Sequence, residues 1–119
     1  MLLQVNVIKK MNYTKIKTER QFRSTTGYSK KEFDCLHKDL QSVYYDLYGQ
    51  TYQDYVAENV TEVPVFSNLG EILFFVLFQL KNNLVYDCLG AVFNMNGSTA
   101  HKNFAKFSIL LEQTLEKKK

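Results

Sequence analysis

Residues 84–115 read LVYDCLGAVFNMNGSTAHKNFAKFSILLEQTL, and the spacing of their apolar side chains predicts two helices joined by a tight turn. In the first half, apolar residues recur at helical intervals, at Val85, Leu89, Val92 and Phe93. The triplet Asn94-Met95-Asn96 then interrupts the pattern. A second apolar stripe follows, at Phe104, Phe107, Leu110 and Leu111. This arrangement is typical of a helix-turn-helix.

Small side chains stand where two crossing helices would approach each other most closely. Gly90 and Ala91 lie in the first predicted helix, and Ala100 and Ala105 lie in the second. Met95 is the apolar residue of the turn, and we expect it to fill the angle between the helices. Because a helix-turn-helix inserts the start of its second helix into the major groove, the pattern predicts binding to double-stranded DNA.

The predicted DNA contacts follow from the predicted start of the second helix. Asn96 is expected to be the N-cap, and the small polar residues after it permit close approach to base edges or phosphates. The candidate DNA-binding residues are Asn96, Gly97, Ser98, Thr99, His101, Lys102 and Lys106. Lys106 lies one turn further on and is assigned to the phosphate backbone. An ordinary helical hairpin with a capped second helix is the alternative, because this helix is not strongly basic.

The remainder of the chain also predicts helices, so the expected fold class is all-α, a small multi-helix domain with a long central helix. Of its 119 residues, 45% are hydrophobic and only five are Gly and one Pro, which argues against both disorder and an all-β fold. Residues 69–80, LGEILFFVLFQL, predict a core helix capped by Ser67 or Asn68. This run is well short of the ~20 residues that span a bilayer.

Two further helix starts are predicted upstream by capping boxes. These are Thr18 with Gln21 and Ser29 with Glu32. Gly27 is expected to end the first, short helix in a left-handed conformation. The second helix is expected to be long, because apolar residues recur on one stripe at Phe33, Leu36, Leu40, Val43, Tyr44 and Leu47.

A tyrosine-rich stretch follows the long helix. Gly49 is expected to kink or end that helix, and Tyr48, Tyr52 and Tyr55 continue the stripe to about Glu58. We interpret these tyrosines as packing residues, because a stacking platform for bases requires a basic surface and this region is acidic. Residues 59–66 predict a loop. The expected organisation is an N-terminal extension over residues 1–17 and a helical domain over residues 18–119, with the helix-turn-helix at 84–115.

Charge is unevenly distributed although the net charge is only +3. Residues 1–40 hold nine basic and four acidic residues, residues 41–81 hold one and five, and residues 82–119 hold five and three. Both ends are therefore basic and the middle is acidic. This pattern suits a chain that binds a polyanion through two segments, and an ordinary protein surface explains it equally well. The candidate phosphate contacts near the N-terminus are Lys9, Lys10, Lys15, Lys17, Arg20 and Arg23.

Several functional classes find no support in the sequence. Cys35 and Cys88 have no metal-binding spacing, and Cys35 is expected at the core or its boundary. His37 and His101 lack companion ligands, and the carboxylates are scattered, so we predict no metal site, no cofactor and no catalytic residue. No signal peptide or membrane span is expected, which favours a cytoplasmic location. Met11 would serve as well as Met1 as the natural start.

Two motifs resemble the N-terminal region of insertion-sequence transposases of the DDE class. Residues 22–33, FRSTTGYSKKEF, resemble that family's F-R-x-L-T-G-x-S-x-x-x-F stretch, and residues 89–100, LGAVFNMNGSTA, resemble its L-G-x-x-F-G-x-S-x-S-T-V stretch. The chain departs from the second motif at Asn94 and Asn96, where the family has Gly and Ser. Asn suits both positions because it adopts left-handed and capping conformations.

The resemblance implies a sequence-specific DNA-binding domain of a transposase that recognises element ends in transposition, a form of DNA recombination. The family's catalytic domain, with its three metal-binding carboxylates, would follow this region and is absent from the chain, so we expect no enzyme. One alternative is a stand-alone DNA-binding regulator derived from a transposase. Another is a protein-interaction or dimerisation module built on the acidic tyrosine-rich middle and the apolar helices.

The expected partner is double-stranded DNA. Two further candidates are a second copy of the chain, as a homodimer, and a separate catalytic transposase frame. The lysines at the end of the chain suggest the separate frame, because lysine codons are rich in adenine and adenine-rich runs promote ribosomal slippage into another reading frame. A solvated helix end with favourably placed cations explains the same lysines equally well.

Overall fold

The computed structural model describes residues 11–59 and 65–117, and these residues form helices only, which confirms the expected all-α fold. The elements are a 3-10 helix η1 (Tyr13–Lys15), α1 (Glu19–Thr26), α2 (Lys30–Tyr48), α3 (Tyr52–Asn59), α4 (Leu69–Asn82), α5 (Tyr86–Phe93) and α6 (Gly97–Lys117). Of the predicted loop at 59–66, residues 60–64 lie outside the described residues.

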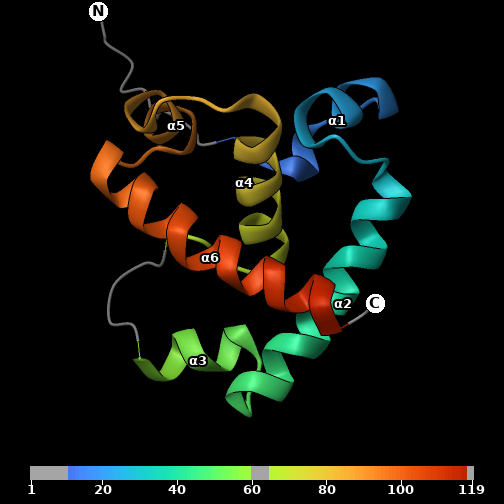
Figure 1. Cartoon of the computed structure of the whole chain (residues 1–119), viewed down its shortest axis with the longest axis vertical. Coiled ribbons are helices and arrows are strands. Elements are labelled where there is room, and N and C mark those ends of the chain that lie inside the picture. The colour runs from blue at the N-terminus through green and yellow to red at the C-terminus, as the bar shows by residue number, and fades with distance from the viewer. Residues whose placement is uncertain (1–10, 60–64, 118–119) are drawn as a thin grey trace, which may run out of the picture.

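Helix α4 lies at the centre of the fold, and α1, α2 and α6 all contact it (Figure 1). It is apolar on almost every side, so several neighbours must cover it. Asn68 is its N-cap, with a side-chain oxygen that accepts from the Glu71 amide at 3.0 Å. The helix ends at Asn83, which adopts the left-handed conformation at φ 49°. The predicted core helix is therefore confirmed.

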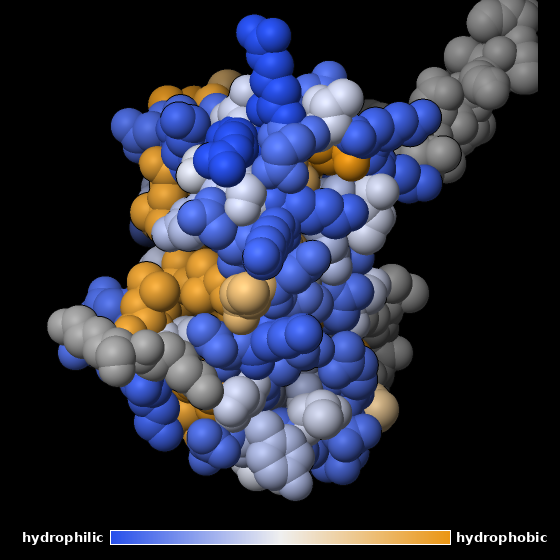
Figure 2. Space-filling view, turned by 90° about the vertical axis from the view of Figure 1, so that its right-hand side faces the viewer, coloured by the Kyte–Doolittle hydropathy of each residue, from blue (hydrophilic) through white to orange (hydrophobic). Residues whose placement is uncertain are grey.

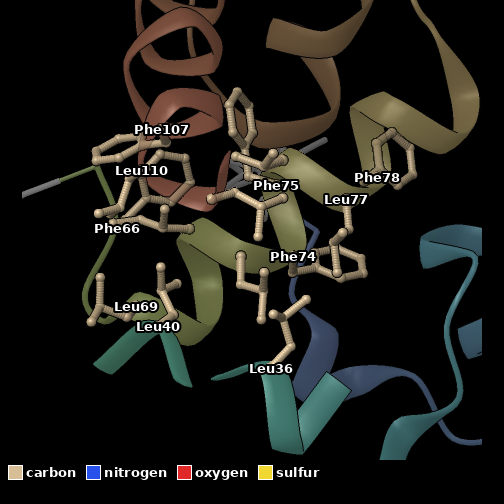
Figure 3. Packing of buried hydrophobic residues seen from close by; sticks show 14 of the residues in the cluster. Leu36, Leu40, Phe66, Leu69, Phe74, Phe75, Leu77, Phe78, Phe107 and Leu110 are labelled. Atoms are coloured by element: carbon tan, nitrogen blue, oxygen red, sulfur yellow. The ribbon is translucent and has the colours of Figure 1, made fainter. Parts of the chain in front are cut away.

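Aromatic rings make up much of the core around α4 (Figure 3). The ring of Phe93, from α5, lies 5.0 Å from that of Phe75 and 5.4 Å from that of Phe78, in both cases edge to face. Phe66 lies 5.1 Å from the same Phe75 ring and packs edge to face against Phe107 of α6 at 5.9 Å. These rings hold α5 and α6 against the central helix.

The two N-terminal helices begin and end at residues whose side chains suit those positions. Ser29 and Glu32 form a complete capping box at the start of α2. At Thr18 the first half of the predicted box forms, with the Thr18 hydroxyl accepting from the Gln21 amide at 3.1 Å. Glu19 accepts from the Lys30 amide at 3.0 Å and so links the starts of α1 and α2. Gly27 ends α1 at φ 80°, as predicted.

Helix α2 buries the predicted stripe with one exception. Phe33, Leu40 and Val43 are almost fully buried, but Leu47 is 42% exposed because the last turn of α2 projects beyond α6 in Figure 1. Gly49 ends the helix at φ 72°. The opposite side of α2 faces solvent, and Figure 2 shows that the α1 and α2 side of the molecule is mainly hydrophilic.

The tyrosine-rich stretch divides between core and surface. Tyr44 and Tyr52 are buried, and their rings meet edge to face at 5.8 Å. The Tyr52 hydroxyl donates to the Phe66 carbonyl at 2.8 Å, and burial raises the pKa of Tyr52 to about 12. Tyr48 and Tyr55 are exposed. The predicted packing is confirmed at Tyr52, and it extends to the core boundary at Tyr48, whose ring lies 4.5 Å from that of the buried Tyr44.

Residues 11–16, which lie in the predicted N-terminal extension, pack on the helical core. The Met11 amide donates to the Val92 carbonyl of α5 at 3.0 Å. The Tyr13 ring lies 5.0 Å from Phe33 and 6.1 Å from Phe74, so it bridges α2 and α4. Its hydroxyl lies against Gly70, where a Cβ would overlap it.

Candidate nucleic-acid interface

The turn between α5 and α6 is built on Gly90. Asn94 adopts the left-handed conformation at φ 59°, and the amides of Asn94 and Met95 both donate to the Gly90 carbonyl. A Cβ at position 90 would overlap the Met95 carbonyl oxygen and lie 3.0 Å from the Asn96 carbonyl carbon. The chain therefore folds back so closely that only glycine fits, and the predicted helix–turn–helix arrangement is confirmed.

The prediction is wrong for two residues of the helix contact and for one residue of the apolar stripe. Gly90 and Ala100 are buried between the helices as expected, but Ala91 and Ala105 are exposed. The reason is geometric, since each successive residue turns 100° around a helix and these alanines point away from the contact. Val85, predicted on the apolar stripe of the first helix, is the N-cap of α5 and is 69% exposed.

The start of α6 is capped as the sequence predicts. The Asn96 side-chain oxygen accepts from the Thr99 amide at 2.8 Å and from the Ser98 hydroxyl at 3.0 Å. The half-buried Met95 packs against the core beside the turn, and its sulfur accepts from the Asn103 side chain at 3.6 Å. The first turn of α6 is thus held at a defined angle to α5.

The candidate DNA contacts divide by their position on α6. Ser98, His101 and Lys102 are exposed, and helical geometry places them on one face of the first two turns. Gly97 and Thr99 are half-buried. Lys106 is exposed one turn further along, with its ammonium 5.1 Å from the centre of the Phe107 ring.

Two residues of α5 that the sequence did not single out complete this surface. The ring of Tyr86 stacks on His101 at 4.5 Å, with 27° between the ring planes. Asp87 lies beside Gly97, where a Cβ would overlap its carboxylate oxygen. No periodicity links these pairs, because the partners are on different helices, so local sequence patterns cannot reveal them.

The basic N-terminal residues are only partly gathered near this surface. Lys15 lines a groove with Ala91 and Val92 of α5, so one lysine flanks the first helix of the motif. Lys17 and Arg20 are exposed in and before α1. Arg23 faces the Glu19 carboxylate at 3.7 Å. Lys9 and Lys10 lie outside the described residues.

Other chemistry finds little support in the part of the chain that the structure describes. No three His, Cys, Asp or Glu residues gather there to hold a metal ion. No helix of residues 11–59 or 65–117 is long and apolar enough to cross a membrane. Cys35 and Cys88 are both exposed, so the expectation that Cys35 lies at the core or its boundary is wrong. Cys35 immediately precedes the buried Leu36 and points away from the stripe.

Helices α4, α5 and α6 together define a three-helix unit of the helix-turn-helix class, in which α6 is the second helix of the motif. Residues 68–117 match the family model of the helix-turn-helix of DDE superfamily endonucleases. The match runs from the N-cap of α4 to the end of α6, so its limits coincide with those of the three-helix unit. No curated protein and no solved structure gives a significant match. The resemblance predicted from the sequence is confirmed for this segment, while the motif at 22–33 lies outside it.

Proposed function

We propose that this chain is the sequence-specific DNA-binding domain of a transposase and recognises the ends of a mobile element. The observation that carries the proposal is the capped start of α6, which exposes Ser98, His101 and Lys102 within a segment of the helix-turn-helix family. A helix-turn-helix presents this part of its second helix to the base edges of the major groove.

Each exposed residue suits a distinct role in such a complex. Ser98 and His101 offer hydrogen-bonding groups to base edges, and stacking on Tyr86 holds the His101 ring in one orientation. Lys102 and Lys106 offer charge to phosphates, as does Lys15 on the far flank of α5. In this proposal the described residues bind DNA and take no catalytic step. A catalytic domain encoded in a separate reading frame would cleave the DNA strands in the cytoplasm.

Fluorescence anisotropy with duplex DNA tests the proposal. A selection from random-sequence duplexes first identifies the preferred site, and binding is then measured at several salt concentrations. Lys102→Ala should weaken binding to all duplexes and reduce the slope of log K against log salt by about one, as expected for one lost phosphate contact. Lys38→Ala removes the same charge from α2, on the other side of the molecule from the start of α6 (Figure 1), and should leave binding unchanged.

A triple variant tests whether the start of α6 recognises the DNA sequence. Replacing Thr99, His101 and Lys102 together by Ala should abolish selective binding while circular dichroism and the oligomeric state stay unchanged. The function would have to be abandoned if the unaltered protein bound no duplex at low salt, or if the triple variant retained full selectivity.

A protein-interaction or dimerisation module is the second candidate, favoured by the exposed aromatic rings at the end of α2. Tyr45 and Tyr48 are 55% and 53% exposed and lie within one turn of each other at the end of α2, so they expose aromatic surface together. Sedimentation of the unaltered protein and of a Tyr45→Ser, Tyr48→Ser variant distinguishes this reading. A dimer that dissociates in the variant supports it, and a monomer at all concentrations contradicts self-association.

A further inference from the structure

The first turn of α6 has no acidic residue, but an acidic residue of α5 lies against it. Helices α1, α2, α4 and α5 each carry a carboxylate in their first turn, as Glu19, Glu32, Glu71 and Asp87, whereas α6 has none. The exposed Asp87 instead lies against the first residue of α6. A Cβ at Gly97 would overlap its carboxylate oxygen and lie 3.2 Å from its backbone nitrogen.

This contact places negative charge where the helix would otherwise attract an anion. The free amides and the dipole at the start of an α-helix favour phosphate. A DNA phosphate that approached Gly97 would meet the Asp87 carboxylate at close range, and both carry negative charge. Like charges at a partly exposed interface reduce affinity by roughly three- to tenfold.

The same carboxylate is well suited to a base. Carboxylates accept hydrogen bonds from the amino group of cytosine in the major groove. Asp87 is one residue after Tyr86, whose stacking on His101 places α5 beside the exposed face of α6. Gly97, against which the Asp87 carboxylate lies, directly precedes Ser98 and is one helical turn before His101.

We propose that Asp87 is a specificity-determining residue, which excludes DNA phosphate from the start of α6 and accepts a hydrogen bond from a base amino group there. The inference rests on the proposed DNA-binding function. A merely structural acid would stabilise the two helix starts without affecting which DNA is bound, and this difference can be measured.

The DNA test compares Asp87→Asn, which keeps the shape of the side chain, with the unaltered protein. Affinity for random-sequence duplexes should rise three- to tenfold at low salt, because the repulsion of phosphate is lost. Affinity for the selected site should not rise in proportion, so the ratio of specific to random binding should fall by about tenfold or more. Glu112→Gln, which removes the same charge from an exposed position fifteen residues further along α6, should change either affinity less than twofold. An unchanged ratio in Asp87→Asn would overturn the proposal.

A second measurement needs no DNA. In a sulfate titration followed by amide NMR, Asp87→Asn should show saturable shifts at Gly97, Ser98 and Thr99, and the unaltered protein should show none in the same range. Equal sulfate binding by both proteins would overturn the proposal even if DNA binding is as expected. If neither protein bound any duplex, the DNA-binding function itself would fail, while the sulfate titration would still report whether Asp87 excludes an anion.

Discussion

Replacing Gly90 by Ala should destabilise the fold through the turn between α5 and α6. The added methyl group would overlap the Met95 carbonyl oxygen and press on the Asn96 carbonyl group at 3.0 to 3.1 Å. These are backbone atoms, so no rotamer change relieves the contact, and the hydrogen bond from the Met95 amide to the Gly90 carbonyl must lengthen.

The expected magnitude follows from three contributions. Overpacking costs roughly 1–3 kcal/mol, and the weakened hydrogen bond costs about 1 kcal/mol. Alanine recovers about 1 kcal/mol of helix propensity. The net loss is therefore about 2 kcal/mol, which for a chain of 119 residues lowers Tm by about 8 °C.

Urea denaturation at constant temperature measures this loss, and duplex binding measures its consequence for α6. Gly49→Ala is the control, because a Cβ there meets nothing within 4 Å and only the strain of its φ of 72° remains. That variant should lose about 1 kcal/mol and bind DNA normally, whereas Gly90→Ala should also bind more weakly. An unfolding free energy for Gly90→Ala at or above that of the unaltered protein would refute the steric reasoning.

Substitutions at three other positions test separate parts of the structure. The buried side-chain amide of Gln79 donates to the Leu84 carbonyl at 2.8 Å, and its oxygen accepts from the Leu84 backbone amide at 3.1 Å. Gln79→Leu should therefore lower the free energy of unfolding, measured by urea denaturation, by about 2 kcal/mol. Asn96→Ala should cost about 1 kcal/mol by removing the cap of α6, whereas Asn96→Asp should keep the stability yet weaken duplex binding by adding negative charge. Burial lowers the pKa of His37 below its usual 6.5, and the nearby Asp34 only partly opposes this. Below pH 6.5 the folded state therefore binds fewer protons than the unfolded state, so the free energy of unfolding decreases as the pH falls from 6.5 toward the folded pKa. His37→Gln should make the free energy of unfolding depend less on pH, as measured by denaturation curves between about pH 7.5 and 5.

Local chemistry explains why so many helix ends could be predicted. A capping side chain accepts hydrogen bonds from amides only two or three residues away. The helix starts at Thr18, Ser29 and Asn96 could therefore be predicted from the neighbouring residues alone. The same reasoning predicted the left-handed ends at Gly27 and, at the break after α5, Asn94.

Apolar spacing was less reliable at the margins of helices. A stripe indicates which side of a helix is buried but not where the helix begins or what covers it. Val85 falls just before α5 and Leu47 lies in a turn that projects beyond its neighbours, so both are exposed despite their place in the pattern.

By itself, the sequence determined the helical class, most helix ends and the position of the turn before α6, because these depend on contacts between residues close in the chain. Only the tertiary structure decided the composition of the candidate interface. It brought Tyr86 onto His101 and Asp87 onto Gly97, and it placed Lys15 on the flank of α5. Such pairings depend on how closely and at what angle two helices cross, which the packing of both helices in the shared core decides rather than any local pattern.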